Sequence, residues 1–528
     1  MLVGAVHALA MTASLGNQWV SPLLQVITMA ALAGAVLQRS RTVNRSVLGS
    51  GFDGLLFGIG WFAMGVGWVY ISMHRYGGMP SVLAGLATLV FACYLALYPA
   101  AGCLIARIWQ RKSPAVSPWS SLRFIVGFAS AITLTELARG YFFTGFPWIS
   151  PGYAHVDGPL AGLAPWGGVY AITWLSSACS GAIAWIACTA KPPAIRLALP
   201  GVLLLASFTM PTWLRSEQIA QTSSALAVTL LQGNINQAMK FDSNQVLNSI
   251  RVYLDLIEAN QPPKDTDKTH LFVLPETAWP TSLDNMPEDI KNRFDRITQS
   301  GRIKVAIGAP HWHNASPGQK QAPAISNSVV VLGQNSLGQN ASENYRYDKT
   351  HLVPFGEFIP AGFQWFMNVL QMPLGSFKRG DARQPSLNLE GQKIAFNICY
   401  EDLFGEELAV QAAQATVLIN LSNLAWFDDS AALDQHLQIA RMRVLETRKP
   451  MLRATNTGAT AVIDSDGRVR NVLPWLSRGQ ITTNVQGNVG STFYMRWTNT
   501  PIVLLCGFAA IILSILTYAR RRSLKAGR

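Results

Sequence analysis

Charged residues are scarce in this chain, at 13% of 528 residues, while 49% are hydrophobic. Soluble domains usually contain about 25% charged residues, so this scarcity argues against an ordinary soluble protein and favours a membrane protein. The scarcity is uneven. Residues 1–214 and the last 28 are mostly apolar, whereas the stretch from about Ser216 to Met495 has the mixed polarity of a soluble domain. The length exceeds that of a single core and predicts two or three domains.

Several motifs that would identify common functions are missing. The sequence has no internal repeat, no P-loop, no dinucleotide fingerprint and no serine-elbow motif. It also lacks a Cys-x-x-Cys pair and the paired histidines of a zinc protease. We therefore expect no metal and no cofactor. The formal charge of +13 does not imply a nucleic-acid partner, because much of it lies in short clusters beside apolar runs.

Cysteine is nearly absent from the polar region. Of six cysteines, only Cys399 lies there, so this region cannot form an internal disulfide. The others lie in apolar segments, where a cysteine packs as a small hydrophobic residue; they are Cys93, Cys103, Cys179, Cys188 and Cys506. Cys399 could also be such a buried residue. However, it ends the apolar run 393–399, and a rigid strand would fix the direction of a nucleophilic thiol.

Apolar runs of membrane-spanning character flank the polar region. About 20 residues are needed to cross a bilayer, and we count eight spans, seven before the polar region and one after it. The runs are 2–15, 20–37, 47–70, 80–106, 122–143, 164–189, 197–213 and 501–519. The first is short and broken by polar residues, and no basic residue precedes it as in a cleavable signal peptide.

Basic residues predict the orientation of these spans. With eight spans, all four basic clusters fall on one side, which the positive-inside rule assigns to the cytoplasm. The polar region would then lie outside the cytoplasm, where a single thiol is a hazard unless it is used. The clusters are Arg39, Arg41 and Arg45; Arg107, Arg111, Lys112 and Arg123; Lys191 and Arg196; and Arg520, Arg521, Arg522, Lys525 and Arg528.

Two charged residues, Glu136 and Arg139, lie inside the fifth apolar run. A charge at the centre of a bilayer costs about 2.5–3.5 kcal/mol on insertion scales, so such residues usually pair or face a polar cavity. Their spacing of three allows pairing on one helix face. A structural ion pair and a substrate contact both fit this pattern.

The polar region alternates short β-rich runs with helical stretches. This alternation predicts an α/β sandwich with helices over the sheets. Strands are expected at 225–232, 271–274, 305–308, 328–332, 393–399, 416–420, 451–455 and 459–463, and helices at 244–259, 404–414 and 432–447. We predict an N-terminal transmembrane domain at 1–214, a catalytic domain at 225–490 and a C-terminal transmembrane helix at 500–520.

Three reactive side chains lie at or just beyond strand ends: Glu276, Lys349 and Cys399. Each alone is weak evidence, since a charged residue at a strand end is usually a solvated surface residue. Together they provide a base, a cation and a thiol, which is what acyl transfer through a thioester requires.

These residues and their neighbours closely resemble the nitrilase superfamily with its Glu-Lys-Cys triad and, within it, the bacterial apolipoprotein N-acyltransferases. The resemblance runs over nearly the whole chain and implies a nitrilase-like αββα sandwich on a multi-pass helical membrane domain of about eight helices. The matching motifs are Thr-Gly-Phe-Pro-Trp (144–148), Gly-Leu-Ala-Pro (162–165), Gln-Gly-Asn-Ile (232–235), Lys-Thr-His-Leu-Val-Pro-Phe-Gly-Glu (349–357), Cys-Tyr-Glu (399–401), Ser-Asn-Leu-Ala-Trp-Phe (422–427) and the run 436–446.

By this resemblance, Glu276 is the general base, Lys349 stabilises the oxyanion and Cys399 is the nucleophile. Glu357 is a second acid that supports them, and a nearby lysine should lower the pKa of the thiol. Family positions around the pocket and its lid are Phe241, Tyr400, Glu401, Trp426 and Phe427. Two departures concern lid details: Phe241 stands where the family often has Trp, and Leu424 replaces a common acidic residue.

The resemblance implies transfer of a fatty acyl chain from a membrane phospholipid, phosphatidylethanolamine, to the α-amine of the diacylglyceryl-cysteine of an apolipoprotein. It also implies a monomer in the bacterial inner membrane with its catalytic domain in the periplasm. Residues 365–374 form either a loop that dips toward lipid or a core helix. The alternative functions are a membrane-tethered amidase or hydrolase with the same triad, and a non-catalytic transporter or lipid-binding scaffold.

Overall fold

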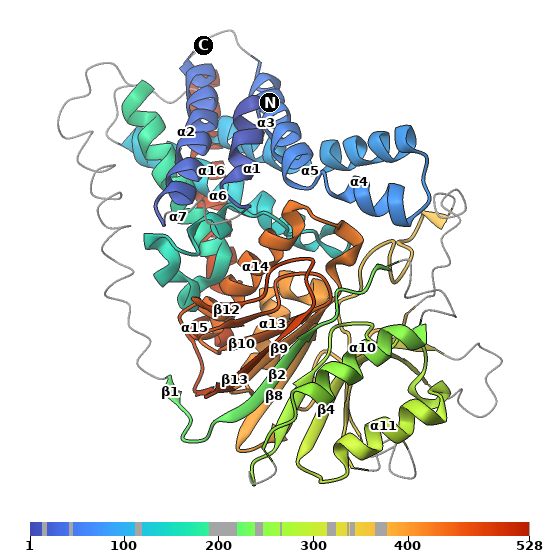
Figure 1. Cartoon of the computed structure of the whole chain (residues 1–528). Helices are drawn as coiled ribbons and strands as arrows, with labels where there is room; N and C mark the ends of the chain where they lie inside the picture. The colour runs from blue at the N-terminus through green and yellow to red at the C-terminus, as the bar shows by residue number, and fades with distance from the viewer. Residues whose placement is uncertain are drawn as a thin grey trace, which may run out of the picture. The chain divides into compact units, whose positions relative to one another are not determined.

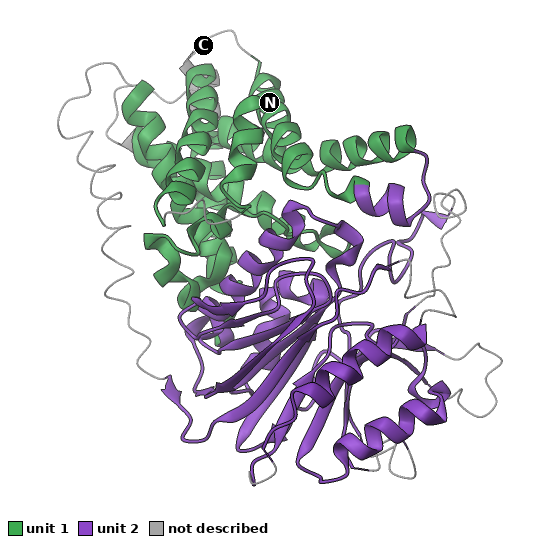
Figure 2. Cartoon of the chain, viewed as in Figure 1, with its two compact units in different colours: residues 1–70, 81–217, 496–528 green, residues 71–80, 218–495 purple. Residues whose placement is uncertain are grey.

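A computed structural model describes residues 1–12, 18–41, 46–110, 119–188, 219–237, 246–263, 267–313, 324–334, 337, 344–364 and 377–526. The chain forms two compact units, shown in two colours in Figure 2. Unit 1 comprises Met1–Tyr70, Ser81–Glu217 and Arg496–Arg528, and unit 2 comprises Ile71–Pro80 and Gln218–Met495. The predicted positions Phe241 and 365–374 lie outside the described residues.

Unit 1 is helical throughout its described part (Figure 1). Five of its helices are long and apolar enough to cross a membrane, or six if the helix of residues 48–65 and the short helix after it count as one bent span. These findings agree with a membrane protein. The main helices are α1 (Leu2–Leu9), α2 (Val20–Arg41), α3 (Leu48–Gly65), α5 (Ser81–Gln110), α6 (Trp119–Tyr141), α7 (Ala164–Cys188) and α16 (Thr500–Ala526).

The eight-span count remains a prediction. The segment expected at 197–213 lies outside the described residues. At eight residues, α1 is also too short to cross a bilayer by itself.

Small residues allow α3 and α5 to pack closely. A Cβ atom at Gly54 would lie 2.6 Å from the carbonyl oxygen of Pro99, and one at Gly58 would lie 2.7 Å from Cα of Ala96. Helices in membranes associate largely through such close backbone packing. The glycine-rich run in α3 therefore has a structural reason.

The ion pair in α6 is a structural contact in this fold. Glu136 and Arg139 are 2% and 1% exposed, and Arg139 Nε donates to Glu136 Oε1 over 3.1 Å. The guanidinium also donates to the carbonyl oxygen of Trp148 and to Ser150 Oγ, each over 3.0 Å. The pair thus anchors the turn that follows α6, where Phe143 has a left-handed φ of 54°.

Glu136→Ala should leave the Arg139 charge buried without its counter-ion and lower the free energy of unfolding by about 3–5 kcal/mol. Thermal unfolding of the purified protein in detergent measures this loss. The double variant Glu136→Gln/Arg139→Gln keeps no uncompensated charge and should lose less. If the double variant lost as much as Glu136→Ala, the ion pair would not account for the effect.

Unit 2 contains two six-stranded sheets and a small third sheet of β1 (Ala220–Gln221) and β14 (Asn488–Val489). The first sheet has the order β13-β2-β3-β4-β5-β6, with bounds Gly479–Val485, Leu226–Gln232, His270–Val273, Ile303–Trp312, Ile325–Leu332 and Tyr345–Asp348. The second has the order β12-β11-β10-β9-β8-β7, with bounds Val469–Val472, Ala461–Ile463, Met451–Thr455, Val417–Ser422, Gln392–Ile398 and Leu387–Leu389.

The two sheets pack face to face, and helices cover their outer faces (Figure 1). Alternate residues of both sheets, among them Val228, Leu230, Phe396 and Ile419, form one shared apolar core. The helices α10 (Val246–Ala259) and α11 (Glu288–Thr298) cover the first sheet, and α13 (Gly405–Ala412) and α14 (Ala431–Thr447) cover the second. The predicted αββα sandwich is confirmed.

The parallel strands in the middle of each sheet direct their carboxyl ends to one edge. In the first sheet β2, β3 and β4 are parallel, with Val273 opposite Ala306, and in the second β8, β9 and β10 are parallel, with Asn397 opposite Asn420. Ligand and catalytic groups in α/β folds gather beyond such strand ends. The segments after β3 and β8 carry Glu276 and Cys399.

A short segment from the N-terminal region belongs to unit 2. It contains the π-helix η1 (Ser72–Tyr76), whose Arg75 and Tyr76 each donate a 2.5 Å hydrogen bond to Asp428. The ring of Tyr76 also meets that of Trp426 edge-on at 5.7 Å. Asp428 has a φ of 45° and directly follows the 3₁₀ helix η8 (Leu424–Phe427).

Candidate active site

Cys399 occupies a strained junction between a strand and a helix. It follows β8, begins the 3₁₀ helix η7 (Cys399–Leu403) and has a φ of 50°. Residues with a side chain rarely adopt this left-handed conformation, and such strain concentrates at functional sites. The thiol is only partly exposed. The prediction that a strand directs Cys399 agrees with this geometry, although β8 ends one residue earlier, at Ile398.

Glu276 lies beyond β3, directly over a glycine of the neighbouring strand. A Cβ atom at Gly308 in β4 would lie 2.7 Å from Cα of Glu276 and 2.8 Å from the Thr277 nitrogen. Real Cβ atoms do not approach other atoms this closely, so only glycine allows the chain to pass here. Gly308 therefore sets the position of the Glu276 backbone.

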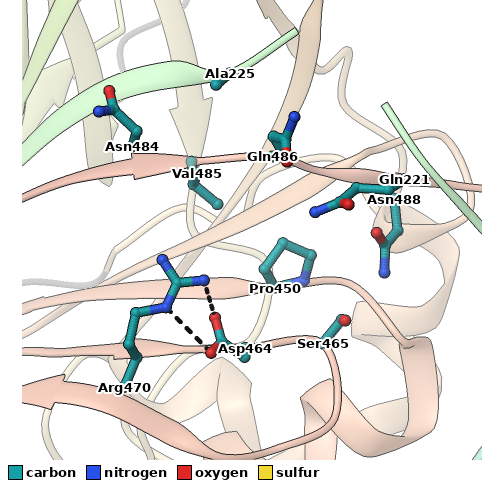
Figure 3. Close-up of a pocket in the computed structure, with 10 residues that line it drawn as sticks. All are labelled: Gln221, Ala225, Pro450, Asp464, Ser465, Arg470, Asn484, Val485, Gln486 and Asn488. Atoms are coloured by element: carbon teal, nitrogen blue, oxygen red, sulfur yellow. Dashed lines mark hydrogen bonds and ion pairs between the residues drawn. The ribbon is translucent and has the colours of Figure 1, made fainter. Parts of the chain in front are cut away.

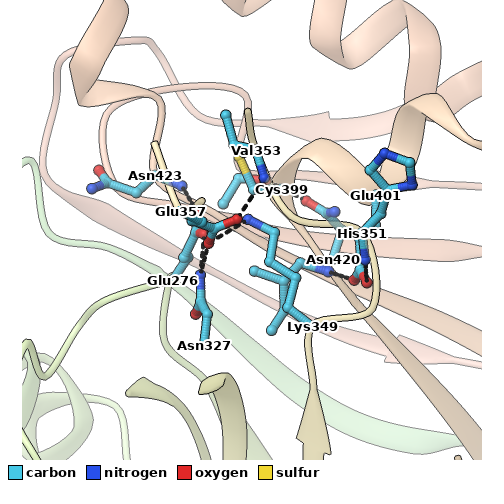
Figure 4. Close-up of polar contacts among 12 residues, drawn as sticks. Glu276, Asn327, Lys349, His351, Val353, Glu357, Cys399, Glu401, Asn420 and Asn423 are labelled. Carbon is cyan, nitrogen blue, oxygen red and sulfur yellow. Dashed lines mark hydrogen bonds and ion pairs between the residues drawn. The ribbon is translucent and has the colours of Figure 1, made fainter. Parts of the chain in front are cut away.

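Lys349 follows β6, and its ammonium group lies between two carboxylates (Figure 4). Lys349 Nζ is 3.3 Å from Glu276 Oε1 and 3.0 Å from Glu357 Oε1. The lysine side chain is 1% exposed. The opposite oxygen of Glu357 accepts a 2.8 Å hydrogen bond from the Val353 backbone nitrogen, which fixes this carboxylate.

Asn327 in β5 joins the same two carboxylates and was missed by the sequence analysis. Its Nδ2 donates to Glu276 Oε1 over 2.9 Å and to Glu357 Oε1 over 2.7 Å. The backbone nitrogen of Asn423 donates to the other oxygen of Glu276 over 2.9 Å. The sequence offered little signal, because Asn327 lies between Ser326 and Ser328 at the start of the strand.

These charges set the ionisation of the lysine and the thiol. Burial alone would lower the pKa of Lys349, but Glu276 and Glu357 raise it above its usual value, so the ammonium stays charged. Burial raises the pKa of the Cys399 thiol, and Glu276, which accepts its hydrogen bond, raises it further against the opposing effect of Lys349. Lys349 lowers the thiol pKa, as expected, but burial and the carboxylates outweigh it, so the net shift is upward.

Glu401 joins the backbones on either side of the site. One of its oxygens accepts hydrogen bonds from the backbone nitrogens of Thr350, at 2.5 Å, and His351, at 3.2 Å. The other accepts a 2.6 Å bond from the Ile398 nitrogen, directly before Cys399. Tyr347 donates to both oxygens over 3.0 Å. Glu401 therefore ties the lysine segment to the cysteine segment.

Three other predicted positions, Tyr400, Trp426 and Phe427, lie in the described residues. Tyr400 is buried, with its ring 5.3 Å from that of Phe404 and 5.7 Å from that of His351. Trp426 and Phe427 are partly exposed on η8, which begins one residue after Asn423. The structure thus brings together Glu276, Lys349, Glu357, Cys399 and Glu401.

Two cavities of about 400 Å³ occur in the described part of unit 2. One contains none of the predicted site residues (Figure 3); it is lined by Gln221, Ala225, Pro450, Asp464, Ser465, Arg470, Asn484, Val485, Gln486 and Asn488. The other borders Glu401 and includes Tyr347, Thr350 and Asn397 in its wall.

Unit 2 is similar to the carbon-nitrogen hydrolases. The carbon-nitrogen hydrolase family model matches residues 214–494, which agrees with the nitrilase-like sandwich. A solved amidase of the nitrilase superfamily from Nesterenkonia is similar over 52% of this chain and 94% of its own, at 14% identity and a TM-score of 0.35.

Relatives that match nearly the whole chain are apolipoprotein N-acyltransferases. The apolipoprotein N-acyltransferase N-terminal domain model matches residues 6–182. Apolipoprotein N-acyltransferase from Ralstonia nicotianae is 41% identical over 99% of this chain and 92% of its own length. The Bordetella bronchiseptica protein of the same name is 38% identical over 96% and 94%. The chain belongs to the apolipoprotein N-acyltransferase family and is an N-acyltransferase of lipoproteins in a membrane.

Gly308→Ala should displace the segment that carries Glu276, and a shift of about 1 Å at a reacting group can reduce turnover about 100-fold. We expect folded protein with strongly reduced acyl transfer, measured with a lipopeptide acceptor. Gly479→Ala is the matched control, since a Cβ there meets only Leu473 at 3.4 Å or more. Equal activity in the two variants would show that Gly308 does not set the position of Glu276.

The pH dependence of Cys399 alkylation tests the raised thiol pKa. Since only the thiolate reacts, alkylation by iodoacetamide should remain slow up to pH 9, beyond the usual thiol pKa of about 8.5. Glu276→Gln removes a charge that raises this pKa and should move the midpoint to lower pH, whereas Lys349→Met should move it higher. Mass spectrometry of the Cys399 peptide separates it from the other thiols. A wild-type midpoint at or below pH 8.5 would contradict the assignment.

Proposed function

We propose that this enzyme transfers a fatty acyl chain from a membrane phospholipid, phosphatidylethanolamine, through a Cys399 thioester to the α-amine of an apolipoprotein's diacylglyceryl-cysteine. The observation that carries the proposal is the convergence of Cys399, Glu276 and Lys349 in a family of N-acyltransferases. These groups are the nucleophile, the base and the cation that acyl transfer needs.

The first half-reaction forms the thioester. Glu276 takes the proton of Cys399 as the sulfur attacks the ester carbonyl, and the lysophospholipid leaves as an alcohol after receiving that proton. The raised pKa of the thiol favours this order, because a neutral thiol needs a base at the moment of attack. Lys349 stabilises the oxyanion, and one such donor typically contributes about 2.7–4 kcal/mol.

The second half-reaction releases the acyl chain to nitrogen. The neutral α-amine attacks the thioester, Glu276 accepts a proton from the amine, and the thiol is regenerated as the amide forms. The donor leaves before the acceptor reacts, so the kinetics should be ping-pong. Glu357 and Asn327 keep Glu276 and Lys349 in place during both steps.

The membrane helices fit substrates that are themselves anchored in lipid. Five apolar helices in the described residues support a membrane-embedded enzyme. We place it as a monomer in the bacterial inner membrane with unit 2 in the periplasm, on the side opposite the basic clusters of the sequence.

Incubation with phospholipid labelled in its acyl chain tests the thioester directly. Without an acceptor, we expect a hydroxylamine-sensitive label on Cys399 that moves to nitrogen when a diacylglyceryl peptide is added. Cys399→Ala should fold, carry no such label and transfer no acyl chain. Acyl transfer by Cys399→Ala would disprove the mechanism. Release of free fatty acid without transfer to the added peptide would instead identify a hydrolase, and no label in wild type would favour a non-catalytic scaffold.

A further inference from the structure

A row of polar side chains lies beneath Cys399 in an otherwise apolar layer. Asn397 of β8, Asn420 of β9 and Arg453 of β10 are in register on three adjacent strands, and each is at most 1% exposed. Their strand neighbours Ala395, Leu418 and Met451 belong to the apolar cluster under α13 and α14. Burying polar groups is costly unless they are paired, so this row requires a reason.

The row is linked to the nucleophile through one histidine. His436 of α14 is fully buried, and its Nε2 lies 3.1 Å from the carbonyl oxygen of Cys399. Its Nδ1 lies 2.7 Å from the Nη2 atom of Arg453. A guanidinium only donates hydrogen bonds, so Nδ1 must accept and carries no proton. The ring proton is therefore on Nε2 and is donated to Cys399.

Arg453 is held in turn by a buried carboxylate. Its Nη1 pairs with Asp402 Oδ2, and Asn397 Nδ2 donates to Asp402 Oδ1 over 2.5 Å. Asp402 and Arg453 are both 0% exposed. The chain of contacts thus runs from Asp402 through Arg453 and His436 to the peptide bond that follows Cys399. Burial, together with the charge of Arg453, lowers the pKa of His436 well below its usual value, which agrees with a neutral ring.

The contact with His436 holds the backbone of Cys399 on the side opposite the contact with Glu401. Glu401 binds the nitrogen of Ile398 before the nucleophile, and His436 binds the carbonyl oxygen after it. Rotation about the Cα–C bond of Cys399 would break the second contact. Because Cys399 has a φ of 50°, its backbone would relax without such contacts and change the direction of the thiol.

We propose that His436, oriented by Arg453 and Asp402, is a positioning residue that fixes the Cys399 peptide and so the direction of sulfur attack. The proposal rests on the proposed role of Cys399 as the nucleophile. It assigns no proton transfer to His436. It predicts that loss of the Nε2 donor slows acylation of Cys399 without weakening the binding of the acyl donor.

The test compares three substitutions at one position and one at its partner. In His436→Leu, we expect the single-turnover acylation rate to fall about 10- to 100-fold, with the donor concentration at half-maximal rate changed less than about twofold. His436→Gln keeps an amide N–H near the position of Nε2 and should recover most of the rate, whereas His436→Glu should not. Arg453→Met should slow acylation as His436→Leu does, and the double variant should be no slower than either.

A matched control separates positioning from stability. Arg443 of α14 is equally buried and pairs with Glu446 over 2.9 Å, and its Nη1 donates to the carbonyl oxygen of Leu403 rather than to that of Cys399. Arg443→Met should lower the thermal unfolding temperature while leaving the acylation rate of the folded protein within about threefold of wild type. Equal slowing in Arg443→Met and Arg453→Met, or equal rates in His436→Gln and His436→Leu, would overturn the proposal.

The acyl donor is chosen so that two failures can be told apart. Acylation of Cys399 is measured with a p-nitrophenyl ester as well as with labelled phospholipid. If wild type reacts only with the nitrophenyl ester, the proposed phospholipid donor is wrong, and the ranking of the His436 variants still tests positioning. If wild type reacts with both and the ranking is flat, only the positioning role is wrong.

Discussion

The site depends on one buried cation, the ammonium group of Lys349, which lies between the carboxylates of Glu276 and Glu357. An unpaired charge buried this deeply would be prohibitively costly, and two carboxylates side by side would repel each other without a cation. Asn327 relieves the same repulsion from the side. The site is built from both sheets. Lys349, Glu276 and Glu357 follow strands of the first sheet, whereas Cys399 follows a strand of the second.

Glu276 and Cys399 could be predicted because each follows a run of apolar residues that is recognisable by itself, whereas Lys349 follows the mixed strand Tyr345–Asp348 and was found through its motif. The sandwich and its central strands were predicted from their apolar runs, with ends displaced by up to four residues. The helix α11 was missed although Ile290, Phe294 and Ile297 have helical spacing, since most of its other residues are charged or polar. β13 was missed because only Ile481 and Val485 of its residues are buried at the edge of the sheet.

The residues that hydrogen-bond to these site residues could not be predicted from local sequence patterns. Asn327 lies between two serines and His436 follows Asp434 and Gln435, so neither stands out in the sequence. The contacts of Asn327, His436 and Arg453 join residues 17 to 51 positions apart. No local pattern encodes such distances. The direction of the Cys399 pKa shift could not be predicted for a related reason. The sequence motifs place a lysine near the cysteine, but the net pKa shift depends on burial and on every carboxylate around the sulfur.

The raised pKa of Cys399 has a consequence for the lifetime of the enzyme. A thiolate attacks peroxides and disulfides much faster than a neutral thiol does, so a sulfur that remains protonated at rest is oxidised slowly. The surroundings that keep the Cys399 thiol protonated therefore also slow its oxidation. In the proposed mechanism, this thiol reacts only when Glu276 takes its proton and remains protonated between turnovers.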